Sequence, residues 1–186
     1  MRRLLASAIT LLLLSGNAAG AQAAADWLDD PLANWNQAGM PIPPPSGEPS
    51  NLAPYCGATL RWPETPQDQM LVDAGWSLQS PYRAGWGTVV VDAASGYDGM
   101  CRPLAYNAFV FQDGVFVGTI SPDLMDSRTS GSGSVTTLQN GRVMARYLRY
   151  APTDPLCCPS LPAVDVTFEI QSTPQGAVLA PVSSYA

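Results

Sequence analysis

Alternation of apolar and polar residues is clearest near the end of the chain, between Ala163 and Gln171. Side chains along a β-strand point to opposite faces, so this pattern predicts an antiparallel strand with one face buried and the other in water. A short edge strand is expected over 177–182, where Pro181 limits its pairing. The buried face comprises Val164, Val166, Phe168 and Ile170, and the solvent face Asp165, Thr167, Glu169 and Gln171.

Two glycine-containing dipeptides predict β-hairpins. Asp113-Gly114 and Asn140-Gly141 each separate two stretches rich in apolar residues. Both dipeptides accept the positive φ angles of a type I′ turn, which suits a two-residue hairpin loop. The four predicted strands cover residues 105–112, 115–120, 135–139 and 142–150.

The first hairpin also predicts a register. A two-residue turn at 113–114 pairs Phe111 with Phe116 and places Phe109 opposite Gly118. A β-branched run at 88–92 predicts one further strand before this hairpin.

One helix is indicated by its end signals. Thr65 is a candidate N-cap, Pro66 suits the first helical position and Asp68 completes a capping box. Gly75 suits the left-handed position after the helix and brings Trp76 towards Leu71. We therefore predict a helix over 66–74.

The residues before this helix form a different kind of segment. Asp30 and Pro31 favour a short helix through Trp35, and the proline-rich stretch 40–50 indicates a polyproline-like spacer or a strap over the domain. Trp27 and Trp35 are expected to pack on the domain or on a partner.

Together these patterns predict an α+β fold, in which an antiparallel β-sheet of about six strands carries one or two short helices. The expected organisation is a signal peptide at 1–23, a proline-rich segment at 24–54 and a domain at 55–182. The signal peptide is indicated by Arg2 and Arg3, the apolar run 4–14 and an A-x-A cleavage site at 21–23, with 19–21 as an equally suitable site. Because no cysteine follows the cleavage site and no later apolar run spans a bilayer, we expect neither lipid attachment there nor a transmembrane segment.

The charged residues exclude several classes of function. The chain has 9 basic and 15 acidic residues, and it lacks both histidine and lysine. An acidic protein does not offer a nucleic-acid footprint. Catalytic triads, histidine metal ligation, Schiff bases and P-loop phosphate binding all require residue types that are missing here. We expect no cofactor and no metal.

Four cysteines in an exported chain predict two disulfides. Cys157 and Cys158 are adjacent between prolines, whereas Cys56 and Cys101 are distant in sequence. Extended backbone would point the two neighbours to opposite sides, so we expect the pairs 56–157 and 101–158, or 56–158 and 101–157. The alternative joins Cys56 to Cys101 and leaves a vicinal bridge.

The candidate binding residues lie on a loop and on exposed aromatic positions. The loop 121–134 is long for a hairpin connection and contains Asp126, Ser127 and Arg128, which could form an internal ion pair or receive an anion. Trp62 and Trp86 are candidates for a glycan- or partner-binding surface. Burial and simple solvation are the alternatives for these residues.

The carboxylates give weaker evidence for a functional site than the loop and the tryptophans. Asp165 and Glu169 could act as an acid–base pair on a glycosidic bond, but we expect them to pair across strands with Arg142, Arg146 and Arg149. The stretch from Asp92 to Asp98 lacks the calcium-loop pattern and is expected to form an acidic turn. We predict no catalytic residue.

Several short motifs, taken in order, resemble the LppP/LprE lipoprotein family of bacterial envelope proteins. They occur between Cys56 and Gln171, and the most specific is Asp154-Pro-Leu-Cys-Cys-Pro-Ser160. The weaker ones are Phe109-x-Phe111, Gly118-Thr-Ile-Ser-Pro122, Met125-Asp-Ser-Arg128, Arg146-Tyr-x-x-Tyr150 and Val166-Thr-Phe168. The resemblance implies a bacterial exported protein of uncharacterised function and assigns no catalytic residue.

The functional expectation is a disulfide-stabilised, non-catalytic protein that is periplasmic, cell-surface or secreted. It would bind an envelope protein, a glycan or a small ligand. The alternative is a hydrolase that uses carboxylates without histidine or lysine, for which acidic side chains would have to converge in one pocket.

Overall fold

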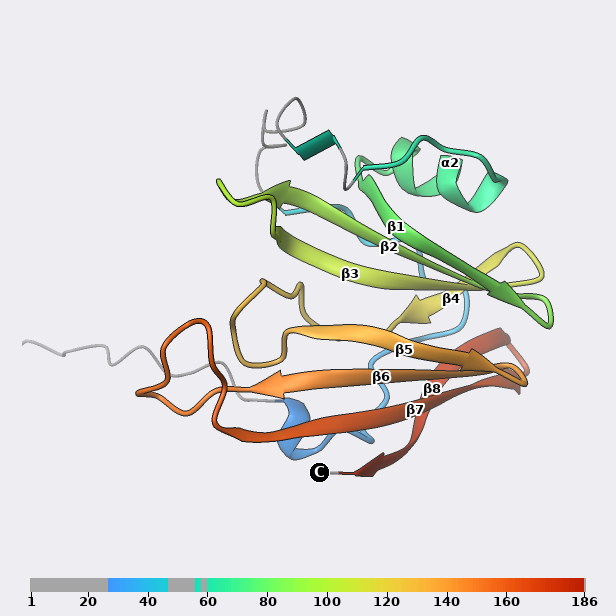
Figure 1. Cartoon of the computed structure of the whole chain (residues 1–186). Coiled ribbons are helices and arrows are strands. Elements are labelled where there is room, and N and C mark those ends of the chain that lie inside the picture. The colour runs from blue at the N-terminus through green and yellow to red at the C-terminus, as the bar shows by residue number, and fades with distance from the viewer. Residues whose placement is uncertain (1–26, 47–55, 58–59, 186) are drawn as a thin grey trace, which may run out of the picture.

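The computed structural model describes residues 27–46, 56–57 and 60–185, and the predicted signal peptide lies outside them. Eight strands form two antiparallel four-stranded sheets, ordered β1-β2-β3-β4 and β5-β6-β7-β8. Figure 1 shows helix α2 above the first sheet and the second sheet beneath it. The elements are η1 (Trp27–Asp29), α2 (Pro66–Asp73), β1 (Ser77–Gly85), β2 (Thr88–Tyr97), β3 (Pro103–Gln112), β4 (Val115–Thr119), β5 (Gly133–Gln139), β6 (Arg142–Arg149), β7 (Leu161–Thr173) and β8 (Gly176–Tyr185).

Both predicted hairpins are confirmed. Asp113 and Gly114 have φ angles of 49° and 85°, and Asn140 and Gly141 have φ angles of 53° and 73°. These positive values are those of a type I′ turn, whose twist matches that of the flanking strands.

The register of the first hairpin is confirmed only in part. Phe111 pairs with Phe116, but Phe109 lies opposite Thr119 and Val110 lies opposite Gly118. The pairing shifts by one residue between Val110 and Phe111, as in a β-bulge. The predicted pairing of Phe109 with Gly118 is therefore wrong, because a bulge leaves no signature in the hairpin turn.

The prediction of about six strands in one sheet was too low. Strand β1 was not predicted, β2 extends to Tyr97 rather than ending at Asp92, and the strands divide into two sheets. Strand β1 contains Pro81 and shifts register against β2 between Leu78 and Tyr82, so it shows no clean alternation. The coarser prediction, antiparallel β-structure with one or two short helices, agrees with the two antiparallel sheets and the one α-helix of the described residues.

Helix α2 begins as its sequence predicts. Thr65 accepts a hydrogen bond from the N–H of Asp68 at 3.2 Å, and Asp68 accepts one from the N–H of Thr65 at 3.2 Å. Gly75 has a φ of 96°, which lets the N–H of Trp76 donate to the carbonyl of Leu71 at 2.9 Å. The helix ends at Asp73, one residue before the predicted end.

Two apolar layers hold helix α2 and the two sheets together. One lies between the sheets and includes Val90, Val110 and Phe168, all fully buried. The other lies between the first sheet and α2, and it packs Leu71 and Trp76 against outward-facing residues of the sheet. The first sheet is thus buried on both faces, which explains its nearly continuous apolar strands.

Residues 27–46 pack on the body of the protein. The predicted helix over 30–35 is wrong, because the short 3₁₀ helix η1 forms earlier and its turn closes when the N–H of Asp30 donates to the carbonyl of Trp27. The predicted packing of Trp27 and Trp35 is confirmed: their rings lie 5.1 Å apart and cover the inter-sheet core. The carbonyl of Pro43 accepts a hydrogen bond from the Trp76 indole at 2.9 Å.

The predicted disulfide pairing is wrong. Cys56 bonds to Cys101, with their Cα atoms 5.2 Å apart, and Cys157 bonds to Cys158. Cys101 lies between β2 and β3 of the first sheet, whereas the adjacent pair lies between β6 and β7 of the second sheet. The chain therefore places the doublet on a different sheet from the other two cysteines.

Candidate functional site

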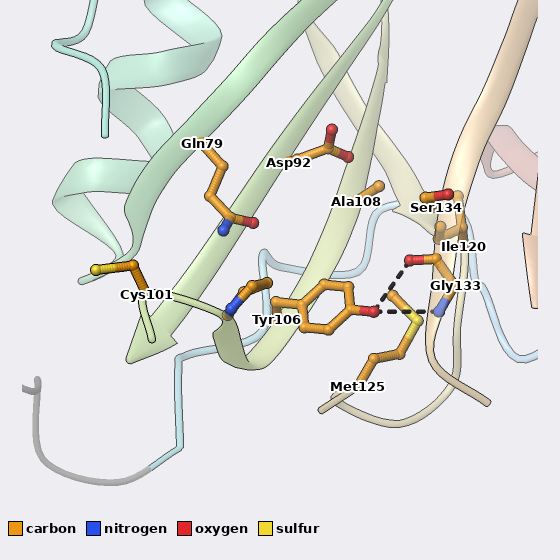
Figure 2. A pocket seen from close by; sticks show the side chains of 10 residues that line it. Gln79, Asp92, Cys101, Tyr106, Ala108, Ile120, Met125, Gly133 and Ser134 are labelled. Carbon is orange, nitrogen blue, oxygen red and sulfur yellow. Dashed lines mark hydrogen bonds between the residues drawn. The ribbon is translucent and has the colours of Figure 1, made fainter. Parts of the chain in front are cut away.

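A pocket of about 430 Å³ opens between the two sheets, near the ends of β3 and β5. Figure 2 shows side chains from both sheets and from the loop 121–134 around this space. Its volume lies in the range of small-molecule sites. The pocket is lined by Gln79, Asp92, Cys101, Pro103, Tyr106, Ala108, Ile120, Met125, Gly133 and Ser134.

One wall of this inter-sheet pocket is apolar. Ala108, Ile120 and Met125 are buried, and their side chains belong to the core between the sheets. Ala108 lies opposite Asp92 across the β2–β3 pairing. A small side chain at that position leaves space beside the carboxylate.

Asp92 is the charged group of the pocket. It shares a face of β2 with Val90, because residues two apart along a strand point the same way. Burial raises the pKa of Asp92 above its ordinary value, although the Arg83 guanidinium, which donates to Oδ2 at 2.6 Å, opposes that shift. The two side chains are only 19% and 21% exposed, so this ion pair is largely withdrawn from water.

The pocket also presents unused hydrogen-bonding capacity. In the part of the chain that the structure describes, Oδ1 of Asp92 accepts no hydrogen bond. Within the same ranges the side-chain amide of Gln79 and the hydroxyl of Ser134 have no partner. Buried polar groups are ordinarily hydrogen-bonded, so the free amide of the buried Gln79 and Oδ1 of the largely buried Asp92 favour an external partner, whereas Ser134 is exposed.

Tyr106 closes the pocket and joins the sheets. Its hydroxyl donates to the carbonyl of Gly133 at 3.1 Å, lies 2.9 Å from the Ser132 hydroxyl and accepts from the N–H of Gly133 at 3.1 Å. Burial raises the pKa of Tyr106 and keeps the phenol neutral. Backbone hydrogen bonds at 2.8 Å in both directions tie Tyr106 to Met125, which positions the loop 121–134.

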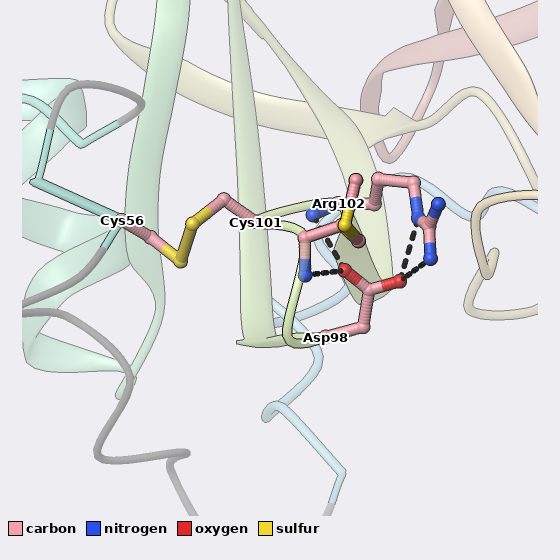
Figure 3. Close-up of a disulfide and its surroundings, with 5 residues drawn as sticks. Cys56, Asp98, Cys101 and Arg102 are labelled. Atoms are coloured by element: carbon pink, nitrogen blue, oxygen red, sulfur yellow. Dashed lines mark hydrogen bonds and ion pairs between the residues drawn. A yellow bond between two sulfur atoms is a disulfide. The ribbon is translucent and has the colours of Figure 1, made fainter.

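Cys101, which lines the pocket, is joined to Cys56 by the disulfide shown in Figure 3. Cys101 has a φ of 58°, in a turn organised by Asp98. The Asp98 carboxylate accepts hydrogen bonds from the N–H of Met100 at 2.8 Å and from the N–H of Arg102 at 3.0 Å, and it forms an ion pair with the Arg102 side chain. The backbone hydrogen bond from Arg102 contributes most to lowering the pKa of Asp98. The predicted acidic turn at 92–98 is thus wrong, since Asp92 belongs to β2.

The predicted loop residues support the loop rather than line the pocket. Asp126 accepts a hydrogen bond from the N–H of Ala105 at 2.7 Å, and the N–H of Ser127 donates to the carbonyl of Pro103 at 3.1 Å. Arg128 has a φ of 69°, and no ion pair joins it to Asp126 in the described part of the chain. Their neighbour Met125 is the loop residue that reaches the pocket.

Trp62 and Trp86 do not form one aromatic surface. Trp62 is 86% exposed and lies in a depression beside α2, together with Val72 and Trp76. Trp86 is 64% exposed and lies in the turn between β1 and β2. A binding role for either residue remains a prediction.

The carboxylates named for the alternative hydrolase lie away from the pocket. Asp165 pairs with Arg146 at 2.6 Å and Glu169 pairs with Arg142 at 2.7 Å, so the predicted cross-strand ion pairs of these two arginines are confirmed. For Arg149 the prediction is wrong, because its guanidinium pairs with Asp29 at 2.6 Å. Hydrogen bonding to Arg146 lowers the pKa of Asp165, the opposite of what a general acid requires. Among the described residues that line the inter-sheet pocket, Asp92 supplies the single carboxylate.

Sequence reasoning missed Asp92, Gln79 and Tyr106. A signal for Asp92 was present, because the run Thr88-Val-Val-Val-Asp92 places an acidic residue on the same face as Val90. Gln79 lies on the strand that was not predicted, and Tyr106 depends on contacts between sheets.

A protein-family model matches part of this chain. Residues 86–173 match the family model described as LppP/LprE lipoprotein. The predicted resemblance to this family is therefore confirmed over these residues, which make up just under half of the chain. The match contains Asp92, Tyr106 and Met125 of the pocket, whereas Gln79 and Arg83 precede it.

This lipoprotein family, whose function is uncharacterised, is consistent with a non-catalytic protein of the bacterial envelope. No curated protein and no solved structure matches the chain significantly. None of the helices in the described residues has the length and apolarity needed to cross a membrane. Cleavage of residues 1–23 and the compartment within or outside the envelope stay predictions.

Proposed function

We propose that this chain is a non-catalytic envelope protein that binds a small organic cation in the inter-sheet pocket. The observation that carries this proposal is Oδ1 of Asp92, an accessible acceptor beside apolar walls. A ligand with an ammonium group at Asp92 and an apolar body against Ile120 and Met125 satisfies both features. Gln79 and Ser134 would then hydrogen-bond to the remaining polar atoms of the ligand.

The electrostatics favour a cation over an anion. Arg83 uses its guanidinium on the other oxygen of the same carboxylate, so it does not offer a free positive charge to the pocket. A ligand ammonium would add a second positive charge and a hydrogen bond at Oδ1 of a carboxylate whose charged form burial penalises. An anion would lie against the unshared carboxylate oxygen and be repelled.

The proposal is tested with 2-phenylethylamine as a probe, by NMR titration of the purified protein. We expect Asp92→Asn to weaken binding by about 10-fold or more, since a charge-assisted hydrogen bond typically contributes about 1.5–3 kcal/mol. Asp165→Asn is the matched control, because it also removes a carboxylate bonded to an arginine at 2.6 Å, but on the exposed face. That control should bind the probe as the parent protein does.

Binding should also depend on pH in a defined direction. The ammonium of the probe stays protonated, so affinity should fall as pH falls through the raised pKa of Asp92. In Asp92→Asn this pH dependence should disappear. Equal affinities for the parent protein and the Asp92 variant, or resonance shifts confined to residues outside the pocket, would contradict the proposal.

A further inference from the structure

A second groove lies at the opposite end of the first sheet from the Cys56–Cys101 disulfide. The hairpin turns β1–β2, β3–β4 and β5–β6 meet there with the ends of β7 and β8 (Figure 1). The groove has a volume of about 880 Å³ and receives residues from both sheets. We call it the hairpin-tip groove, and its principal side chains are Trp86, Gln112, Asp113, Asn140, Arg142 and Glu169.

Trp86 is the unusual residue of this groove. It occupies the first central position of a two-residue turn, with a φ of 53°, and Gly87 follows with a φ of 76°. Asn, Asp or Gly is favoured at the first position of such a turn, and a bulky residue in left-handed backbone is strained. Since its ring is also 64% exposed, neither local propensity nor core packing accounts for a tryptophan here. Strain of this kind, maintained at an exposed aromatic residue, is typical of ligand-binding positions.

The backbone that carries Trp86 is held firmly. The N–H of Asp113 donates to the carbonyl of Gly87 at 2.9 Å, which joins the tips of two hairpins. Gln112 accepts a hydrogen bond from the Thr88 hydroxyl at 2.7 Å and donates to the Asp113 carboxylate at 3.0 Å. The indole ring is therefore presented from a rigid base, which reduces the entropy lost when a ligand binds.

The positive charge in the groove is compensated within it, whereas the Asp113 carboxylate has a hydrogen-bond donor but no counter-charge there. Arg142 forms an ion pair with Glu169 at 2.7 Å, and Asp113 accepts from the Gln112 amide. The groove thus offers no uncompensated positive charge to an anion, and the chain as a whole carries a net charge of −6. What it does offer is amide, carboxylate and guanidinium groups beside an exposed aromatic face.

We infer that the hairpin-tip groove binds a neutral oligosaccharide. The C–H face of a sugar ring stacks on an indole, while its hydroxyls both donate and accept hydrogen bonds. Asn140 can do both, the carboxylates of Asp113 and Glu169 accept, and Arg142 donates. The groove volume suits a few sugar rings rather than the broad, flat contact of a protein partner.

The test is isothermal titration calorimetry of the purified protein with maltohexaose, cellohexaose and the hexamer of N-acetylglucosamine. At least one of these probes should bind, and Trp86→Asn should weaken that binding about 10-fold or more. Trp86→Phe should weaken it less, because a smaller aromatic face remains. Trp62→Asn is the control, as it removes another exposed tryptophan from outside the groove and should leave affinity unchanged.

The thermal stability of Trp86→Asn provides a second measurement, and it should increase although binding is lost. Asn-Gly is the favoured type I′ dipeptide, so Trp86→Asn should raise the thermal midpoint by about 2–4 °C while binding is lost. A gain in stability excludes misfolding as the cause of lost binding. Absence of binding to all three probes, or equal binding by the parent protein and Trp86→Asn, would overturn the inference. Asp92→Asn should leave saccharide binding intact, so failure at one site does not imply failure at the other.

Discussion

Replacing Cys56 and Cys101 together by serine should lower the free energy of unfolding by about 4 kcal/mol. The bond between them closes a loop with a sequence separation of 45, and opening it restores conformational freedom to the unfolded chain. Replacing Cys157 and Cys158 by serine should change stability by less than about 1 kcal/mol, because a bond between neighbours closes no loop of consequence. Denaturant unfolding of the two double variants, without reductant, measures both values.

This pair of variants separates the observed pairing from the crossed pairings. If each cysteine of the doublet were bonded to Cys56 or Cys101, either double replacement would remove both bridges. The two variants would then be destabilised alike. Similar large losses in both variants would contradict the structure, and so would a small loss on replacing Cys56 and Cys101.

Asn36→Ala should destabilise the protein by about 3–5 kcal/mol. The Asn36 side chain is buried and bridges the two sheets: its amide donates to the carbonyl of Thr119 at 3.0 Å and to that of Leu179 at 3.2 Å. Its Oδ1 also accepts from the N–H of Thr119 at 2.9 Å. Truncation takes this partner from the N–H of Thr119 and the carbonyl of Leu179, and such losses carry a desolvation penalty. The carbonyl of Thr119 keeps the hydrogen bond from the Trp35 indole at 3.2 Å.

Gln37→Ala is the matched control for this prediction, because Gln37 is the exposed neighbour of Asn36 and should contribute little. Chemical denaturation gives the change in stability. Hydrogen exchange at the N–H of Thr119, which bonds to Asn36, reports whether the loss is local to β4. A loss below about 1 kcal/mol in Asn36→Ala would mean that residues 27–46 do not stabilise the junction of β4 and β8.

Local chemistry explains what could be predicted from the sequence. The Asp113-Gly114 and Asn140-Gly141 turns and the Thr65 capping box depend on a few neighbouring residues. The alternation in β7 predicts which of its faces is buried, because that face packs in the core between the sheets. Each of these signals is contained within about ten residues.

The features that could not be predicted from the sequence depend on long-range packing. The division into two sheets, the bulge beside Phe111 and the partner of Cys101 depend on contacts between distant segments. The turn at Trp86-Gly87 escaped prediction because a tryptophan rarely occupies left-handed backbone. The inter-sheet pocket combines Asp92 of the first sheet with Ser134 of the second, and sequence spacing does not indicate their proximity.

NMR titration of the side-chain carboxyl carbon of Asp92 tests whether this largely buried carboxylate faces a ligand pocket. The pKa of Asp92 should lie above that of an exposed aspartate, and it should fall when 2-phenylethylamine is added, because a bound cation favours the ionised form. The Asp92→Asn variant lacks this carboxyl resonance and therefore identifies it in the spectrum. An Asp92 pKa that is not above the ordinary value of an aspartate, and that does not change when the probe is added, would contradict the proposed cation site.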